Sequence, residues 1–330
     1  MSRAVALRLG AFAGVLVLAF AGAFAIGSAV DPIAAADTQE PAQAHDDQGG
    51  MGDMEPAAGH GEGHGDASAQ PPGLAVSQAG YTLVPATTFF QPNQQTPLRF
   101  TVTGPDGKPV TRYTKTHEKD LHLIVVRRDL SGFHHVHPTM DAQGNWSIPF
   151  RFTAGGTWRL YADFQPAGHN QPITLGTDVN VSGLYIPVPL NEPASVFSIH
   201  GYDVTLAGSP QAGKESELTF TVSKGGKPVT DLQPYLGAFG HLVSLRSGDL
   251  AYLHNHPAEH AEAGGKGGPK ITFGTTFPTA GTYSLFLDFQ HAGAVHTAEF
   301  TVTVDADGTT IVPPTALPST PGHDTTPHGH

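Results

Sequence analysis

The sequence contains no cysteine among its 330 residues. Disulfides and thiolate metal ligands are therefore excluded together, so any metal site must use imidazole, carboxylate or thioether groups. Charged residues are also scarce, at 14%, and lysine plus arginine number 17 against 29 aspartates and glutamates. The net charge of −12 argues against nucleic acid and anionic membrane surfaces as ligands. Without disulfides, stability must come from burial of apolar side chains, which domains of about 100 residues can achieve.

Common enzyme signatures are missing as well. The sequence has no Gly-x-Ser-x-Gly elbow, no glycine-rich phosphate loop before a helix and no His-Glu-x-x-His. We therefore expect a protein that is not an enzyme. A histidine-site metalloenzyme is kept as an alternative, because an open three-histidine site can activate water.

An apolar run from Leu9 to Val30 follows Arg3 and Arg8 near the N-terminus. It is long enough to span a bilayer, and the arginines favour a cytoplasmic N-terminus. The alanines at 34–36 also resemble a cleavage site. We therefore interpret residues 1–36 as a signal anchor or a signal peptide. The body is expected outside the cytoplasm, anchored in the cytoplasmic membrane or, after cleavage, secreted.

Two polar segments flank the body. Residues 37–73 are rich in histidine, glycine and proline, and residues 306–330 in proline, threonine and histidine. Neither shows the apolar periodicity of a folded element, so both are expected to be disordered. Histidine-rich tracts of this kind bind metals only weakly unless they become ordered.

Between these flanks the sequence contains two copies of one domain, predicted at 74–183 and 184–305. The run Gly107-Lys-Pro-Val-Thr111 recurs identically from Gly226 to Thr230. Each copy holds about seven short runs of alternating hydrophobicity separated by turn residues. This pattern predicts an all-β fold of two tandem immunoglobulin-like antiparallel β-sandwiches.

Each copy also holds a predicted β-hairpin that begins with histidine and ends in His-x-His-Pro, at 122–138 and 241–257. In the second copy, a two-residue turn at Gly248-Asp249 would place His241 opposite His256 and Val243 opposite His254. The same parity in the first copy turns His134 away from its neighbours. Histidines occupy three matching places in the copies: His122, His135 and His137 in the first, and His241, His254 and His256 in the second.

Residues directly opposed, or two apart on one strand, project from the same face of a hairpin. Histidines two apart lie roughly 7 Å apart at Cβ, so their rings can converge on one ion with bonds of about 2 Å. Metal ligation is the main interpretation. Core packing with hydrogen bonding and a pH-sensing role are the alternatives, because buried imidazoles need partners.

Two carboxylates recur at one place in the repeat, Asp163 and Asp288. Each is expected to be a fourth ligand, an acceptor that orients a ligand histidine, or a plain structural hydrogen-bond partner. His296 is a further candidate ligand for the second copy. Imidazoles with a carboxylate suit Cu²⁺ or Zn²⁺.

The second hairpin, followed by Phe277-Pro-Thr-Ala-Gly-Thr-Tyr283, resembles bacterial β-sandwich proteins associated with heavy-metal handling. The YtkA-like domains and CopC-type copper carriers are the families it resembles. The resemblance implies a secreted or membrane-anchored metal-handling protein. CopC-type carriers are expected to use a mature N-terminal histidine as a copper ligand, and none is evident here, so the metal stays open.

The predicted function is therefore extracytoplasmic binding, buffering or delivery of a divalent ion, with a protein partner that the sequence does not identify. The alternatives are an immunoglobulin-like structural or adhesion-type surface protein without metal, and the metalloenzyme.

Overall fold

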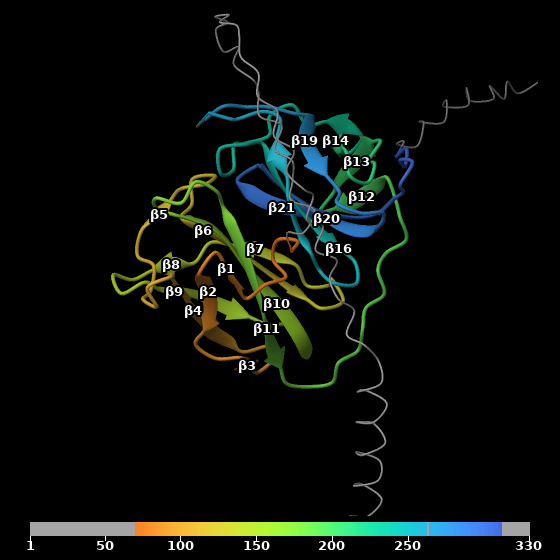
Figure 1. Ribbon diagram of the computed structural model, residues 1–330. Coiled ribbons are helices and arrows are strands. Elements are labelled where there is room, and N and C mark those ends of the chain that lie inside the picture. The colour runs from red at the N-terminus through yellow and green to blue at the C-terminus, as the bar shows by residue number, and fades with distance from the viewer. Residues whose placement is uncertain (1–69, 263, 312–330) are drawn as a thin grey trace, which may run out of the picture. The chain divides into compact units, whose positions relative to one another are not determined.

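The computed structural model describes residues 70–262 and 264–311 (Figure 1). Regular structure in this part of the chain consists of β-strands, without an α-helix. Within the same ranges, no helix is therefore long and apolar enough to cross a membrane. The expected N-terminal segment at 1–36 and most of the two polar flanks lie outside the described residues.

The first repeat contains eleven strands in two sheets. One sheet has the order β1-β2-β4-β9-β8, and the other has the order β3-β11-β10-β6-β7 with β5 paired to β10. The strands are β1 Ser77–Gln78, β2 Tyr81–Pro85, β3 Phe89–Phe90, β4 Gln95–Thr103, β5 Tyr113–Thr114, β6 Leu121–Arg127, β7 His134–Val136, β8 Thr139–Met140, β9 Asn145–Arg151, β10 Gly156–Pro166 and β11 Ile173–Val181.

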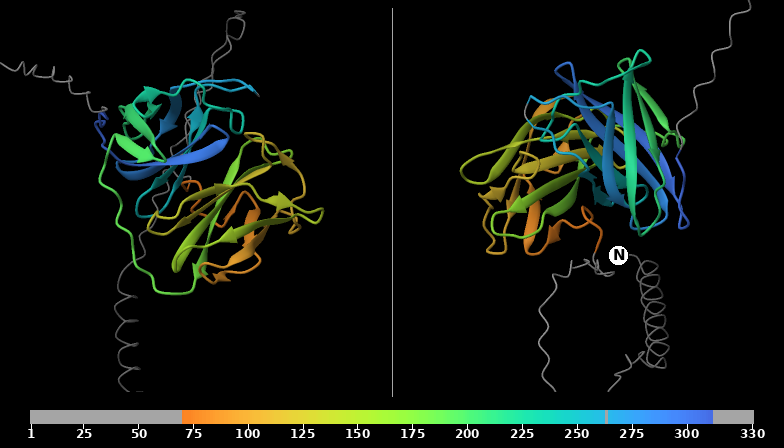
Figure 2. Two further views of the ribbon diagram at one scale, coloured as in Figure 1. Left: turned by 180° about the vertical axis from the view of Figure 1, so that it is seen from behind. Right: turned by 90° about the horizontal axis from the view of Figure 1, so that it is seen from above.

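The second repeat has the same plan, and the layering of its long strands is visible in Figure 2. Its sheets run β12-β13-β14-β19-β18, with β15 paired to β14, and β17-β16-β20-β21. The strands are β12 Val196–Ile199, β13 Tyr202–Gly208, β14 Glu215–Lys224, β15 Lys227–Pro228, β16 Gly240–Arg246, β17 Tyr252–His254, β18 His256–Pro257, β19 Lys270–Thr276, β20 Gly281–His291 and β21 Ala294–Val304.

These strand orders are those of immunoglobulin-like sandwiches, so the predicted fold class is confirmed. A tyrosine corner supports the assignment in the second repeat, where the Tyr283 hydroxyl donates to the Thr279 carbonyl at 2.8 Å. In the first repeat Trp158 occupies the matching place, and its indole N–H donates to the Ala154 carbonyl at 3.0 Å. Both bonds fix the approach to the central strand β10 or β20.

Replacing Tyr283 with phenylalanine is expected to lower the free energy of unfolding by about 1 kcal/mol, because the Thr279 carbonyl loses its donor. Urea titration followed by tryptophan fluorescence measures the change. Tyr185→Phe, on a ring that is 43% exposed, is the control and should change little. Equal losses in both variants would contradict a specific role for the corner.

The central strands are buried on both faces. Along β10, Trp158, Leu160, Ala162 and Phe164 enter the core of their own sandwich, as expected from the alternation of residues between Trp158 and Phe164 in the sequence. The intervening Tyr161 is equally buried, but in a separate apolar cluster that joins residues of both repeats. The second face of the sheet is therefore not a solvent face.

The cluster that joins the repeats is built from matching aromatic pairs. Phe133 stacks on Phe286 with ring centroids 3.9 Å apart, and Tyr161 packs on Tyr252 at 5.7 Å. Phe133 and Tyr252 occupy equivalent positions in the two hairpins, and Tyr161 and Phe286 occupy equivalent positions in β10 and β20. The hairpin aromatic of each repeat therefore packs on the central strand of the other repeat. The Tyr161 hydroxyl also donates to the Leu250 carbonyl at 2.6 Å. Both repeats belong to one compact unit of the chain, and this contact lies next to the histidines.

Candidate metal site

The first hairpin brings its three predicted ligands together. His122 lies in β6, His135 lies in β7 opposite Ile124, and His137 follows directly after β7. His134 faces the opposite way, with its ring 5.1 Å from that of Phe150. The predicted parity of this hairpin is therefore confirmed.

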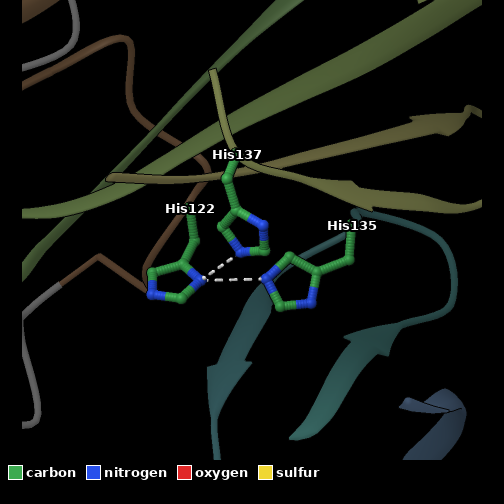
Figure 3. A group of neighbouring side chains, drawn as sticks. All are labelled: His122, His135 and His137. Atoms are coloured by element: carbon green, nitrogen blue, oxygen red, sulfur yellow. Dashed lines mark hydrogen bonds between the residues drawn. The ribbon is translucent and has the colours of Figure 1, made fainter. Parts of the chain in front are cut away.

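The three rings converge at one point (Figure 3). The Nδ1 atom of His122 lies 3.0 Å from Nε2 of His135 and 3.1 Å from Nε2 of His137. One nitrogen from each ring lies within 4.8 Å of the other two. Three nitrogens bound tetrahedrally at 2.0–2.1 Å are about 3.3 Å apart, so the rings need only small shifts to surround an ion.

Hydrogen bonds on the outer side fix the protonation of two rings. His122 Nε2 lies 2.9 Å from the Thr116 carbonyl oxygen, which accepts only, so this nitrogen carries the proton. His135 Nδ1 lies 2.9 Å from a carboxylate oxygen of Asp288 and likewise donates. In neutral rings, the inner nitrogens Nδ1 of His122 and Nε2 of His135 therefore carry lone pairs.

Hydrogen bonding among neutral rings cannot satisfy this arrangement. His137 Nε2–H can donate to the single lone pair on His122 Nδ1. The contact between His122 and His135 would then set two lone pairs against each other at 3.0 Å. A proton between these two nitrogens satisfies one contact, whereas a divalent ion satisfies all three nitrogens at once.

The surroundings favour neutral rings on His122 and His137. Burial, reinforced by the neighbouring imidazole of His135, lowers the pKa of His122 to about 3. The same causes lower the pKa of His137 to about 2. Neutral imidazole is the form that binds a metal ion, so these rings are ready to act as ligands at neutral pH.

The two recurring carboxylates, Asp163 and Asp288, lie next to His122 and His135. Asp288, on β20 of the second repeat, accepts from His135 and, at 2.6 Å, from the Thr297 hydroxyl. Asp163 pairs with His122 in the ladder and accepts from the hydroxyls of Thr174 and Tyr252 at 3.1 and 3.3 Å. The sequence left three roles open for Asp288. In the structure it accepts a hydrogen bond that orients His135, a histidine of the other repeat.

Replacing Asp288 with asparagine is expected to weaken ion binding about 10–100-fold, because a neutral amide holds the His135 N–H less strongly and lowers the basicity of Nε2. Competition against a chelator of known affinity measures the loss. Asp203→Asn, at a half-buried position where the carboxylate accepts from the Ser198 hydroxyl, is the control. An unchanged affinity in Asp288→Asn would show that this carboxylate does not support the site.

In the second repeat, His241 occupies the position of His122 and makes the same bond to a backbone carbonyl. Its Nε2 lies 2.8 Å from the Tyr235 carbonyl, as His122 does from Thr116, and burial lowers its pKa to about 4. Val243 lies opposite His254, as predicted. The side chains of His254 and His256 lie outside the described part of the structure.

Two details of the second hairpin differ from the prediction. The turn is longer than two residues, because Leu250 N donates to the Arg246 carbonyl and the Asp249 carboxylate accepts from Ala251 N. The backbone of His256 pairs with Gly274 of the other sheet and not with His241. The Asn255 amide donates to the Leu242 carbonyl at 2.9 Å and ends the ladder, so the chain crosses between sheets.

His296 is not brought to this cluster. It lies opposite Phe289 on β21, whereas its neighbour Thr297 lies opposite Asp288, so the two project from opposite faces. Its Nδ1 lies 3.2 Å from Nδ1 of His200, and its ring packs on Tyr202 at 4.6 Å. Burial lowers its pKa.

Sequence reasoning missed His117, whose ring lies 6.0 Å from that of His122 and 5.1 Å from that of His241. Comparison of the repeats discards this residue, because the second copy has Leu236 at the matching place. The sequence feature that could have identified His117 as a candidate is its position five residues before His122.

The fold and the site define a protein of two immunoglobulin-like domains with a histidine trio in the first. Residues 76–183 and 196–306 each match the family described as "Domain of unknown function (DUF8832)". The chain therefore belongs to that family and carries two copies of its domain. No curated protein sequence matches the chain, and the resemblance to YtkA-like and CopC-type proteins stays a prediction.

Solved structures to which the chain is similar include an adhesin, two domains of an S-layer protein and an invasin. The Escherichia coli adhesin FdeC is 17% identical, with 70% of this chain and 65% of that chain covered and a TM-score of 0.23. Domains 4 and 5 of the S-layer protein SbsC are 11% identical, with 70% and 100% covered and a TM-score of 0.22. Invasin, described as a bacterial integrin-binding protein, is 14% identical, with 67% and 39% covered and a TM-score of 0.19. The chain thus spans slightly less than two thirds of FdeC. TM-scores this low support no inference about function.

Proposed function

We propose that this protein binds a divalent metal ion, Cu²⁺ or Zn²⁺, through His122, His135 and His137, for buffering or delivery outside the cytoplasm. The observation that supports this most strongly is the convergence of three ring nitrogens, with Nδ1 of His122 and Nε2 of His135 3.0 Å apart, on rings whose outer nitrogens already bond to Thr116 and Asp288. A divalent ion would satisfy all three inner nitrogens at once, whereas a shared proton satisfies only one of their contacts.

The ligand set narrows the choice of ion. Three imidazole nitrogens suit Zn²⁺ and Cu²⁺, and intrinsic affinity favours Cu²⁺. With three protein ligands, a tetrahedral ion keeps a fourth position for water or an exchanging ligand. An open position suits an ion that is taken up and passed on. The proposed location follows from the sequence of residues 1–36.

The competing proposal is a surface protein whose immunoglobulin-like domains serve structure or adhesion without metal. It is supported by the apolar cluster between the repeats, which buries the sheet faces beside the histidines through aliphatic side chains and two aromatic pairs, without a metal ion. That cluster accounts for the burial of Tyr161 and Phe286, but not for the convergence of three nitrogens. The metalloenzyme alternative has no comparable observation in its favour.

A competition titration tests the proposal. The full chain, purified without a polyhistidine tag, is titrated with Zn²⁺ or Cu²⁺ against a chelator strong enough to outcompete the histidine-rich flanks. Saturable binding that survives the chelator is expected. If the chelator removes all ions, metal handling by the trio is wrong and the structural proposal stands.

A further inference from the structure

His117 lies on a tight turn that both repeats share. In the first repeat, Thr116 and Lys119 exchange backbone hydrogen bonds at 2.9 and 3.1 Å, and in the second Tyr235 and Ala238 do so at 2.8 and 3.3 Å. His117 and its counterpart Leu236 both have positive φ, 46° and 56°. The backbone conformation therefore belongs to the fold, and only the side chain distinguishes the two turns.

The turn also places a carbonyl against a hairpin histidine. Thr116 accepts from His122, and Tyr235 accepts from His241. Since His241 Nε2 is the donor in its bond, the Nδ1 atom of that ring carries a lone pair in the neutral form. His241 thus presents the same nitrogen that His122 contributes to the trio.

The rings of His117 and His241 are as close to each other as the rings within the trio, with their planes at 83°. Ring centroids within the trio are 4.9, 5.0 and 5.2 Å apart, and those of His117 and His241 are 5.1 Å apart. Imidazoles bound tetrahedrally at 2.0–2.1 Å have centroids about 5.2 Å apart. The distances that link this pair to the trio are longer, 6.0 Å from His117 to His122 and 6.3 Å from His241 to His135.

One ion cannot be shared by all five rings. Among the described residues, the group whose nitrogens lie within 4.8 Å of one another consists of His122, His135 and His137. His117 and His241 are therefore next to the trio's ion but beyond its reach. The pair comes from two different repeats, whereas the trio comes entirely from the first.

We propose that His117 and His241 bind a second divalent ion across the boundary between the repeats, adjacent to the ion of the trio. The inference rests on the proposed function, because it uses the same ions and the same neutral imidazoles. It replaces one independent site per repeat with a centre of two neighbouring ions, in which the first repeat supplies four of the five described ligands. The centre is asymmetric, because the second repeat has Leu236 at the position of His117 and so has no equivalent histidine to contribute.

The test uses His117→Leu, which installs the side chain that the second repeat carries at the same backbone conformation. Wild type and variant are loaded with Cu²⁺ in a chelator buffer that keeps the flanks free of metal. Wild type is expected to hold two ions with magnetic coupling visible by electron paramagnetic resonance. The variant should hold one uncoupled ion, with the affinity of the trio unchanged within about twofold. His169→Leu, whose ring contacts Tyr81 and Gln171, is the control and should match wild type.

The outcomes separate the two proposals. If His117→Leu retains two ions, or wild type holds two without coupling, the inter-repeat position is wrong while the trio stands. The same holds if wild type retains a single ion that is lost only when a trio histidine is replaced. If wild type retains no ion against the chelator, the proposed function fails, and the inference fails with it.

Discussion

Replacing His137 with alanine is expected to weaken tight binding of Cu²⁺ or Zn²⁺ by about a thousandfold, or about 4 kcal/mol. The variant loses one of three converging nitrogens, and the remaining two cannot hold the ion against a chelator. Folding should survive, because His137 is only partly buried and its ring contacts are with the other two rings of the trio and, at 6.3 Å, with Tyr235. Chelator competition on wild type and variant gives the ratio of affinities.

His134→Ala is the matched control. His134 lies in the same short strand, but its ring faces Phe150 on the other side of the hairpin. Its removal should leave ion affinity within about threefold of wild type, a change below 1 kcal/mol. Equal losses in His134→Ala and His137→Ala would mean that general destabilisation, and not ligand loss, explains the effect.

Acid is expected to destabilise the metal-free protein. Burial lowers the pKa of His122 to about 3 and that of His241 to about 4 in the folded chain. In the unfolded chain both pKa values return to about 6.5. Between the folded and unfolded pKa values the unfolded state binds more protons, so the free energy of unfolding decreases as the pH is lowered. The stability is fully present above pH 6.5 and is lost as the pH falls toward the folded values. Each deeply buried ring accounts for up to about 2 kcal/mol at pH 5.

Urea titration of the metal-free protein at pH 7.5 and pH 5.0 measures this loss. Saturating Zn²⁺ should raise stability at pH 7.5 and lose its effect as the pH falls, because protons compete for the same nitrogens. His260→Ala, in an exposed loop position, should show the full pH dependence of wild type. Equal free energies of unfolding at the two pH values would contradict burial of neutral histidines in this cluster.

The repeat and the strand periodicity were enough to predict the fold class and the parity of the hairpin. His122, His135 and His137 could be grouped because ladder pairing fixes which side chains share a face. The alternation of β10 likewise revealed its core face. Neither inference needs contacts between distant parts of the chain.

The partners of these residues depend on packing between the repeats, and local pattern does not encode it. The apolar run of β6 gave no sign that Ile124 and Val126 face the other repeat while Leu123 enters its own core. The acceptor of His135 is Asp288, 153 positions away in sequence. The pairing of His256 was wrong because the Asn255 side chain ends the ladder there. A side-chain cap of this kind leaves the hydrophobic pattern unchanged.

X-ray absorption at the zinc edge, on protein loaded with one equivalent of Zn²⁺, tests the central claim most directly. The proposed site predicts three imidazole nitrogens at about 2.0–2.1 Å around the ion, with the multiple scattering typical of imidazole rings. That pattern should disappear in His137→Ala and persist in His134→Ala. A spectrum dominated by oxygen ligands, or one that both variants leave unchanged, would contradict metal binding by His122, His135 and His137.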